Sequence, residues 1–216
     1  MDTVGPLGVM GLDEHPMLME GVAAVIGREL PGFRWLGSAQ SPGRLEALMA
    51  ALGPPDILLV DLHSGGGADL ETRLRDWTSR GIACVIYTAE LRPVPLRRAV
   101  EAGACGLALK SDPIASLLDV LEVVSAGEFA VSGELAHALV TDPDLVPRLA
   151  PRELETLVLL GEGLPRKAVG RRMTPPVGTA TVVTYVNRVG DRYRSLGRPV
   201  NSVADVIRAA TQDGYL

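Results

Sequence analysis

The chain has 216 residues, of which 47% are hydrophobic and 22% are charged, and its formal net charge is −5. This length suffices for one large domain or two small ones. No apolar run approaches the roughly 20 residues of a membrane helix, and the first residues lack the pattern of a secretory signal, so neither membrane insertion nor secretion is expected.

The charges are unevenly distributed along the chain. Residues 1–147 contain 10 basic and 20 acidic side chains, a net charge of −10. Residues 148–216 contain 11 basic and 6 acidic side chains, a net charge of +5. This reversal of sign indicates an acidic module joined to a module that binds polyanions.

The first 125 residues alternate short apolar runs with amphipathic stretches. The runs have the length of typical strands and are almost continuously apolar, as in strands buried on both faces. The predicted strands are Leu7–Leu12, Phe33–Gly37, Asp56–Asp61, Ile82–Tyr87 and Gly106–Lys110. The predicted helices are Met17–Leu30, Pro42–Leu52, Asp69–Arg80, Pro93–Ala102 and Pro113–Ser125. Five repeats of strand and helix predict an α/β domain with a parallel five-stranded sheet.

The pattern changes after residue 125. Residues 126–148 are expected to form a linker with a short helix over Glu134–Val140. Beyond it the periodicity is purely helical, and glycines at positions 161, 163 and 197 are natural helix stops. The predicted helices are Arg152–Gly161, Arg166–Met173, about Gly178–Leu196 and Ser202–Thr211. Residues 149–216 therefore predict a small all-α domain of four helices.

Polar residues end four of the five predicted strands. Asp13 and Glu14 follow the first, Asp61 ends the third, Thr88 follows the fourth and Lys110 ends the fifth. In open parallel sheets, ligands bind at the edge formed by the carboxyl ends of the strands. Carboxylates about 4 Å apart repel by on the order of 4 kcal/mol, so the cluster requires a cation, and oxygen ligands suit Mg²⁺. An Asp in such a site can accept a phosphoryl group, whose oxygens a hydroxyl and an ammonium would bind.

These five residues and the segments LDEHP, PDILLVDL and AGACGLALK resemble the receiver domain of bacterial response regulators, in the NarL/FixJ branch. The resemblance implies a flavodoxin-like (βα)5 fold and a sensor histidine kinase as partner. It further implies Mg²⁺ at Asp13, Glu14, Asp61 and the backbone of His63, phosphorylation of Asp61, and phosphate sensing by Thr88 and Lys110.

Two positions depart from the family pattern. Where the family places a Met-Pro pair after the phosphoacceptor, this chain continues His63-Ser64-Gly65-Gly66-Gly67. Where the family places an aromatic residue three positions before the lysine, this chain has Leu107. These departures bear on how phosphorylation is transmitted more than on the phosphate-binding set itself.

The segment LAPRELETLVLLGEGLPRKAVGRRM resembles the LuxR-type helix-turn-helix domain of the same family, which implies double-stranded DNA as a partner. The implied recognition helix runs from about Gly178 to Leu196, with a buried stripe at Val182, Val186, Val189 and Tyr193. Asp191 lies on the same outward face and is unfavourable there unless it pairs with Arg188 or Arg194. The predicted contacts to bases or phosphates are Arg166, Lys167, Thr181, Thr184, Asn187, Arg188 and Arg192.

Together these resemblances imply a cytoplasmic two-component response regulator that controls transcription and is not an enzyme. Phosphorylation of Asp61 is expected to change dimerisation, and a symmetric homodimer suits an operator with two half-sites. One alternative is an atypical regulator that binds DNA but is gated by a ligand or by dimerisation alone. Another is an aspartate-nucleophile phosphatase or phosphotransferase, which would place an acid where this chain has His63.

Overall fold

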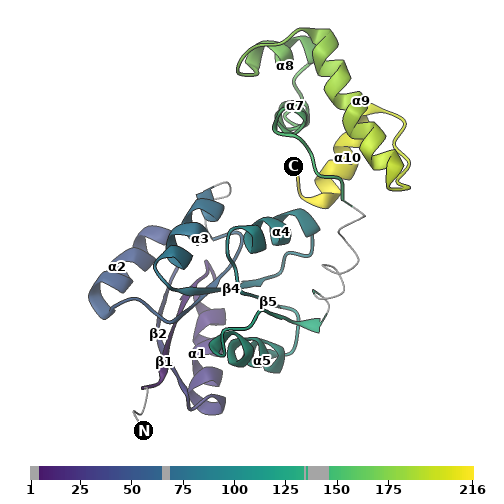
Figure 1. Cartoon of the computed structure of the whole chain (residues 1–216). Helices are drawn as coiled ribbons and strands as arrows, with labels where there is room; N and C mark the ends of the chain where they lie inside the picture. The colour runs from purple at the N-terminus through teal and green to yellow at the C-terminus, as the bar shows by residue number, and fades with distance from the viewer. Residues whose placement is uncertain (1–4, 65–68, 134, 136–145) are drawn as a thin grey trace. The chain divides into compact units, whose positions relative to one another are not determined.

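The computed structural model describes residues 5–64, 69–133, 135 and 146–216 (Figure 1). The chain divides into two compact units. The α/β unit comprises Met1–Leu91 with Leu96–His137, and the helical unit comprises Arg92–Pro95 with Ala138–Leu216. Across the described ranges, each helix is too short or too polar to cross a membrane.

The α/β unit is built on a parallel sheet with the strand order β2-β1-β3-β4-β5-β6. Helices cover both faces, with α1 and α5 on one face and α2, α3 and α4 on the other (Figure 1). The strands are β1 Leu7–Leu12, β2 Phe33–Ala39, β3 Ile57–Val60, β4 Ala83–Thr88, β5 Gly106–Leu109 and β6 Ala130–Val131. The helices are α1 Pro16–Glu29, α2 Pro42–Leu52, α3 Leu70–Ser79, α4 Pro93–Glu101 and α5 Ile114–Ser125.

The predicted parallel α/β architecture is confirmed, but the expected count of five strands is wrong. A sixth strand, β6, pairs Ala130 with Gly106 and Val131 with Leu107 of β5, and the Ser132 N–H donates to the Leu107 carbonyl at 2.9 Å. β6 lies inside the segment expected to be a linker. A strand of two residues is too short to show a hydrophobic period, so the sequence pattern could not reveal it.

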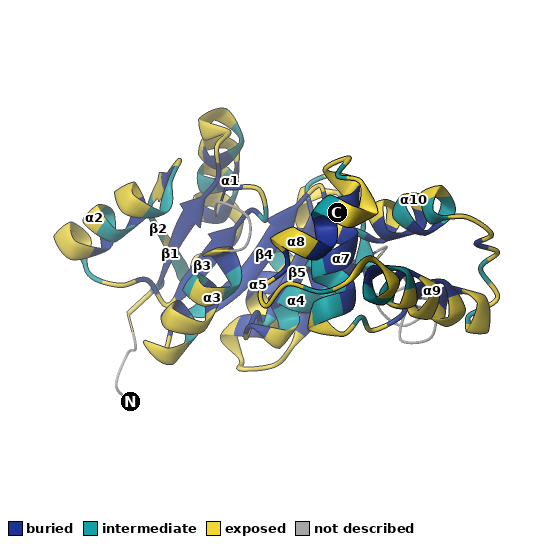
Figure 2. Ribbon diagram, turned by 90° about the horizontal axis from the view of Figure 1, so that it is seen from above, coloured by how far each residue is buried: buried dark blue, intermediate teal, exposed yellow. Residues whose placement is uncertain are grey.

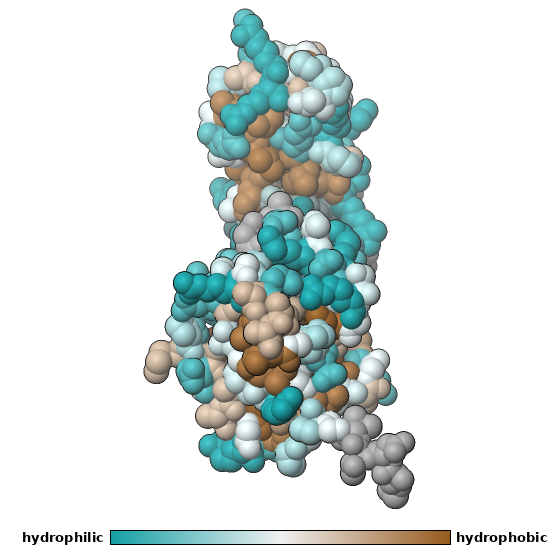
Figure 3. Space-filling view, turned by 90° about the vertical axis from the view of Figure 1, so that its left-hand side faces the viewer, coloured by the Kyte–Doolittle hydropathy of each residue, from teal (hydrophilic) through white to brown (hydrophobic). Residues whose placement is uncertain are grey.

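The core of the α/β unit lies between the sheet and its helices, as the buried residues in Figure 2 show. All four residues of β3 are buried, as expected for a strand covered on both faces. On the α1 and α5 side, Val9, Ile57 and Val85 of the strands pack with Ile26 of α1 and Leu121 of α5. The face of the molecule seen in Figure 3 mixes hydrophilic residues with patches of apolar residues.

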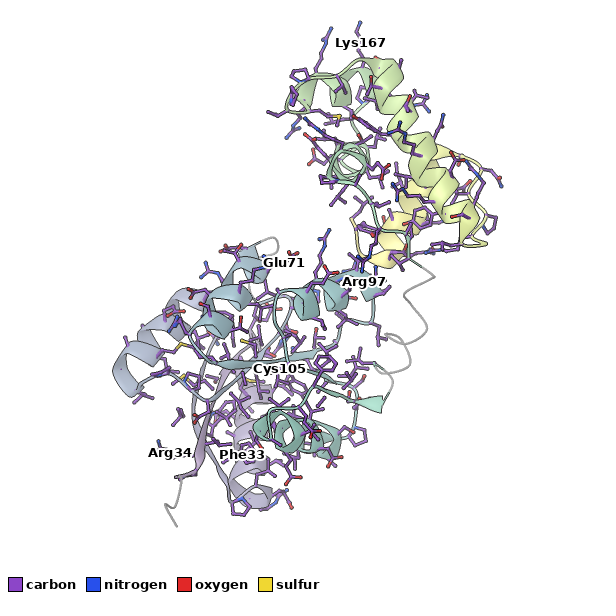
Figure 4. All side chains as sticks on the ribbon, in the orientation of Figure 1. Phe33, Arg34, Glu71, Arg97, Cys105 and Lys167 are labelled. Carbon is purple, nitrogen blue, oxygen red and sulfur yellow. The ribbon has the colours of Figure 1, made fainter. Side chains whose placement is uncertain are left out.

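Both cysteines, Cys84 and Cys105, are free. Cys84 of β4 is buried, and Cys105, labelled in Figure 4, is half-buried. Burial raises the pKa of the Cys84 thiol to about 12 and also raises the pKa of Cys105. Neither thiol is therefore activated as a nucleophile at neutral pH.

The described part of the helical unit contains α7 Pro151–Gly161, α8 Arg166–Arg172, α9 Thr179–Ser195 and α10 Val203–Asp213. These limits lie within two residues of those predicted. The predicted stripe of Val182, Val186, Val189 and Tyr193 is buried, as expected. The predicted helix over Glu134–Val140 falls, apart from Leu135, outside the described residues.

Candidate functional site

The polar residues predicted to converge follow neighbouring strands of the sheet. Leu12 of β1 and Val60 of β3 are register partners, and the N–H of Asp61 donates to the Leu12 carbonyl at 2.9 Å. At the ends of β4 and β5, the Lys110 N–H donates to the Thr88 carbonyl at 2.8 Å. Because all these strands are parallel, the residues that follow them gather at one edge of the sheet.

Lys110 joins the two aspartates at the centre of this edge. Its Nζ lies 2.7 Å from Oδ2 of Asp13 and 3.1 Å from Oδ1 of Asp61. Both carboxylates are almost fully buried, with 2% and 3% exposure. Burial lowers the pKa of Lys110, but its hydrogen bonds to Asp13 and Asp61 outweigh this and raise the pKa overall. One ammonium therefore faces two buried acids, which leaves negative charge uncompensated.

The other carboxylate oxygens are held by the loops that follow β1 and β3. Oδ1 of Asp13 accepts the His15 N–H at 2.9 Å, and Oδ2 of Asp61 accepts the His63 N–H at 3.2 Å. The two loops are tied together because Oγ of Ser64 accepts the Glu14 N–H at 3.0 Å. These bonds fix the orientation of both acids. The sequence gives no signal for Ser64, whose role depends on the approach of two distant loops.

Glu14 and Asp61 line one pocket of about 480 Å³, together with His63, Ala89 and Lys110. The imidazole of His63 lies between two acids, with Nδ1 3.9 Å from Oδ2 of Asp61 and Nε2 3.9 Å from Oε2 of Glu90. Glu90 is buried and was not predicted as a site residue. Its position two residues after Thr88 could have indicated in the sequence that it lies near the same edge of the sheet. Asp61, although almost fully buried, therefore lies on the wall of this pocket.

Thr88 lies at the same edge, but it is fully buried and makes no hydrogen bond to Asp61 in the part of the chain that the structure describes. Its Oγ1 accepts the N–H of Glu90 at 3.1 Å. That bond uses a lone pair of the hydroxyl oxygen, so the hydroxyl hydrogen remains available to an incoming acceptor.

The predicted Mg²⁺ ligands are only partly gathered. Among the described residues, no group of three or more His, Cys, Asp and Glu side chains is placed to hold a metal ion. However, Oδ2 of Asp13 and Oδ1 of Asp61 are buried without any described hydrogen-bond partner beyond the Lys110 ion pair. These two hard oxygens, with the Glu14 carboxylate on the pocket that Asp61 lines, have the chemistry that Mg²⁺ prefers. The metal-ligand role of the His63 carbonyl stays a prediction.

Of the two departures from the family pattern, Leu107 lies within the described residues and the glycine-rich loop does not. Leu107 lies on β5 and is fully buried, so an aliphatic side chain fills the position where the family pattern has an aromatic ring. The glycines of the Gly65–Gly67 loop fall outside the described residues.

In the helical unit, a basic surface covers α8. Arg166 and Lys167 are exposed as predicted, and the Lys167 side chain projects outward from α8 (Figure 4). Lys167 also lines a groove of about 490 Å³ with Arg171 and Arg172, two residues that were not among the predicted DNA contacts. Lys167 and Arg171 are four residues apart, and this spacing indicates from the sequence that both lie on one face of the helix.

The predicted DNA-contacting residues of α9 divide into two groups. Thr184, Asn187 and Arg188 are exposed, and Thr181 is half-buried. Arg192 is instead engaged within the unit, because Nη1 donates to the Arg148 carbonyl at 2.9 Å. Its Nε lies 3.4 Å from Oε2 of Glu153, a residue that is almost fully buried.

Asp191 does form an ion pair with one of its two candidate partners. Its Oδ1 lies 2.6 Å from Nη2 of Arg194, one of the two partners foreseen, so this acid is neutralised on the outward side of α9.

Comparisons with known proteins agree with this geometry, although no protein-family model matches the chain. The chain is 32% identical over 200 residues to the nitrate/nitrite response regulator protein NarL of Escherichia coli (strain K12). The aligned region covers 88% of this chain and 90% of that relative. Other curated relatives include the transcriptional activator protein ExaE of Pseudomonas putida, which is 25% identical over 97% of this chain and 98% of that relative, and the response regulator RamR of Streptomyces coelicolor, which is 32% identical over 68% of this chain and 72% of that relative.

Solved structures point the same way. A two-component response regulator of the LuxR family from Aurantimonas sp. SI85-9A1 matches with a TM-score of 0.57 and 28% identity, over 64% of this chain and 98% of that chain. RcsB from Salmonella enterica serovar Typhimurium, bound to promoter P1flhDC, matches with a TM-score of 0.68 over 96% of this chain and 99% of that chain. Its identity is only 17%, so this second likeness concerns the fold alone.

Proposed function

Since the chain belongs to the NarL/FixJ family of bacterial response regulators, we propose that it is a transcription regulator phosphorylated on Asp61 by a sensor histidine kinase. In this proposal residues 1–125 form the receiver domain, 126–148 the linker and 149–216 the LuxR-type DNA-binding domain. The observation that supports it best is the buried pair Asp13 and Asp61 joined by Lys110 at the carboxyl edge of the sheet.

Receiver domains of response regulators generally use Mg²⁺, and here Asp13, Asp61 and Glu14 would hold it. When bound, Mg²⁺ neutralises the acidic pocket so that an anionic phosphodonor can approach. A carboxylate oxygen of Asp61 attacks phosphorus, and the bond from phosphorus to the donor nitrogen or oxygen breaks. The leaving group carries away the electron pair of that bond and takes up a proton from solvent.

Two side chains of this chain then receive the new phosphoryl group. The Lys110 ammonium exchanges part of its contact with Asp61 for a phosphoryl oxygen, a charge-assisted hydrogen bond. The Thr88 hydroxyl, whose hydrogen is not used by Glu90, donates to a second phosphoryl oxygen. Thr88 must move toward Asp61 to do so, and this movement is the signal that alters homodimerisation and binding of double-stranded DNA.

A second candidate function keeps DNA binding but omits phosphorylation. The observation that favours it is Leu107, because a fully buried aliphatic side chain offers no ring to follow Thr88 inward. In that case a ligand or constitutive dimerisation controls the DNA-binding unit.

Incubation of the whole protein with acetyl phosphate and Mg²⁺ separates these candidates. Intact mass is expected to show one alkali-labile phosphoryl group on the native protein and on Asp119→Asn, an exposed acid of α5, but none on Asp61→Asn. Binding to double-stranded DNA is then compared with and without the phosphodonor. An unmodified protein that still binds DNA supports the second candidate, and a protein that binds no DNA under either condition contradicts both.

A further inference from the structure

The strip of α9 that lies opposite its buried stripe carries little net charge. Opposite the buried stripe, α9 exposes Ala180, Thr184, Asn187, Arg188 and Asp191. Residues spaced by three, four, seven or eight positions share one helix face, so these five form a continuous strip. Arg188 is the single cation in it, and Asp191 is neutralised by Arg194 at 2.6 Å.

The side chains of this strip are available to an external partner. Neither the Asn187 amide nor the Arg188 guanidinium makes a hydrogen bond or ion pair with any residue that the structure describes. The Thr184 hydroxyl donates to the Ala180 carbonyl at 3.0 Å. Thr184 therefore offers an acceptor and a methyl group, and Ala180 offers a methyl group alone.

In the major groove, this combination of side chains matches A·T pairs with the exception of Arg188. An Asn amide pairs in bidentate fashion with N6 and N7 of adenine, methyl-bearing side chains contact the thymine methyl group, and Arg pairs with O6 and N7 of guanine. We infer that α9 selects a DNA half-site composed mainly of A·T pairs, with adenine bound by Asn187, thymine methyl groups packed on Ala180 and Thr184, and one guanine bound by Arg188. This rests on the proposed function, in which α9 enters the major groove.

In this inference, α9 selects the DNA sequence and α8 supplies the electrostatic attraction to DNA. Four of the seven residues of α8 are cationic, namely Arg166, Lys167, Arg171 and Arg172. Three of these line the groove on α8, where phosphate oxygens of the DNA backbone are the matching partner. Uncharged substitutions on α9 therefore change which sequence is bound, whereas substitutions on α8 change how strongly binding depends on salt.

Selection from a random duplex library with the whole protein tests the inference. Enriched half-sites are expected to consist mainly of A·T pairs with one conserved guanine. Replacement of individual thymines by deoxyuridine, which removes only the methyl group, is expected to weaken binding by about 4-fold at the contacted positions. The same replacement outside the half-site serves as the control and leaves affinity unchanged.

Substitution of the amide identifies the residue that reads adenine. Asn187→Ala is expected to weaken binding to the enriched site by about 10-fold or more and to remove the preference for adenine at one position, with the salt slope unchanged. Asn201→Ala, an exposed Asn between α9 and α10, is the matched control and binds as the native protein does. Arg171→Ala is expected to reduce the log–log salt slope by about 0.9 without altering the preferred sequence.

The outcomes distinguish failure of this inference from failure of the proposed function. A protein that binds no duplex at any salt concentration, whether or not it has been incubated with acetyl phosphate and Mg²⁺, contradicts the proposed function and the inference together. Enrichment of G·C-rich half-sites, or an A·T-rich site whose adenine preference survives in Asn187→Ala, overturns the inference and leaves DNA binding intact.

Discussion

The guanidinium of Arg192 on α9 is bound to the buried carboxylate of Glu153 on α7, with Nε 3.4 Å from Oε2. The same carboxylate accepts the N–H of Ala150 at 2.8 Å and so caps the start of α7. Arg192 also donates to the Arg148 carbonyl. Although the sequence placed Arg192 among the DNA contacts, its position indicates that it fastens α9 to the beginning of α7.

Replacement of Arg192 by Ala is expected to lower the free energy of unfolding of the helical unit by about 2 kcal/mol, because it leaves the buried Glu153 carboxylate without its cation. Urea denaturation monitored by circular dichroism measures this loss. Arg188→Ala is the matched control, since Arg188 is exposed on the same helix, and its stability is expected to stay within about 0.5 kcal/mol of the native value. A stable Arg192→Ala variant with altered sequence preference would instead support the original assignment as a DNA contact.

Removal of the Lys110 ammonium is expected to destabilise the α/β unit. Lys110→Met keeps the length of the side chain but leaves Asp13 and Asp61 buried and unpaired, a change expected to cost about 3 kcal/mol. The chain has only one other lysine, Lys167, which is exposed on α8, so Lys167→Met is the matched control and should unfold like the native protein. Equal unfolding midpoints for both variants would show that the two acids do not depend on Lys110.

Mg²⁺ is expected to raise the thermal midpoint of the native protein, since it adds positive charge at the edge of the sheet where the Lys110 ammonium faces two buried acids. At a concentration of about 100 times its dissociation constant, the stabilisation is about 2.7 kcal/mol. Differential scanning calorimetry with and without Mg²⁺ measures the shift, and Asp13→Asn is expected to reduce it. A shift of the same size in Asp13→Asn would place the cation elsewhere.

The sequence predicted the parts of this molecule that repeat a local pattern. The α/β unit, the helix limits of the helical unit and the meeting of Asp13, Asp61 and Lys110 all follow from apolar runs and the residues that end them. The sequence did not predict features that depend on contacts between distant segments of the chain. The two-residue strand β6 has no period of its own, and the partner of Arg192 is decided by how α9 packs on α7. Exposure alone, which sequence periodicity estimates well, does not distinguish a DNA contact from an ion pair.

Gly170 on α8 is expected to tolerate no larger residue. A Cβ at this position would collide with the backbone carbonyl of Val177, whose own N–H donates to the Gly170 carbonyl at 2.7 Å. Gly170→Ala is therefore expected to destabilise the unit by about 2 kcal/mol, although Ala favours a helix by about 1 kcal/mol over Gly. Gly190→Ala on α9 is the control, because its nearest neighbour is the flexible end of Arg194 at 3.3 Å. Chemical denaturation should show Gly190→Ala at native stability or above, and a similar result for Gly170→Ala would contradict the close approach.

Tyr193 is expected to make the stability of the helical unit sensitive to alkaline pH. Its hydroxyl donates to Oδ2 of Asp213 at 2.8 Å, and Asp213 is held in turn by Arg198 at 2.7 Å. Burial, followed by the hydrogen bond to Asp213, raises the pKa of Tyr193 far above its usual value. Tyrosines of the unfolded chain ionise at about pH 10, so above that pH the folded state binds more protons and its stability falls as pH rises.

Tyr193→Phe removes both the hydrogen bond and the titrating group. Below about pH 9 the native protein is expected to be more stable than this variant by about 1–2 kcal/mol, a difference that should shrink above about pH 10. Urea unfolding of the two proteins across this range measures the difference. Tyr185→Phe, at a half-buried position on the same helix, controls for alkaline effects elsewhere in the chain. A difference between native protein and Tyr193→Phe that stays constant through the alkaline range would show that Tyr193 ionises equally in both states, contrary to its burial beside Asp213.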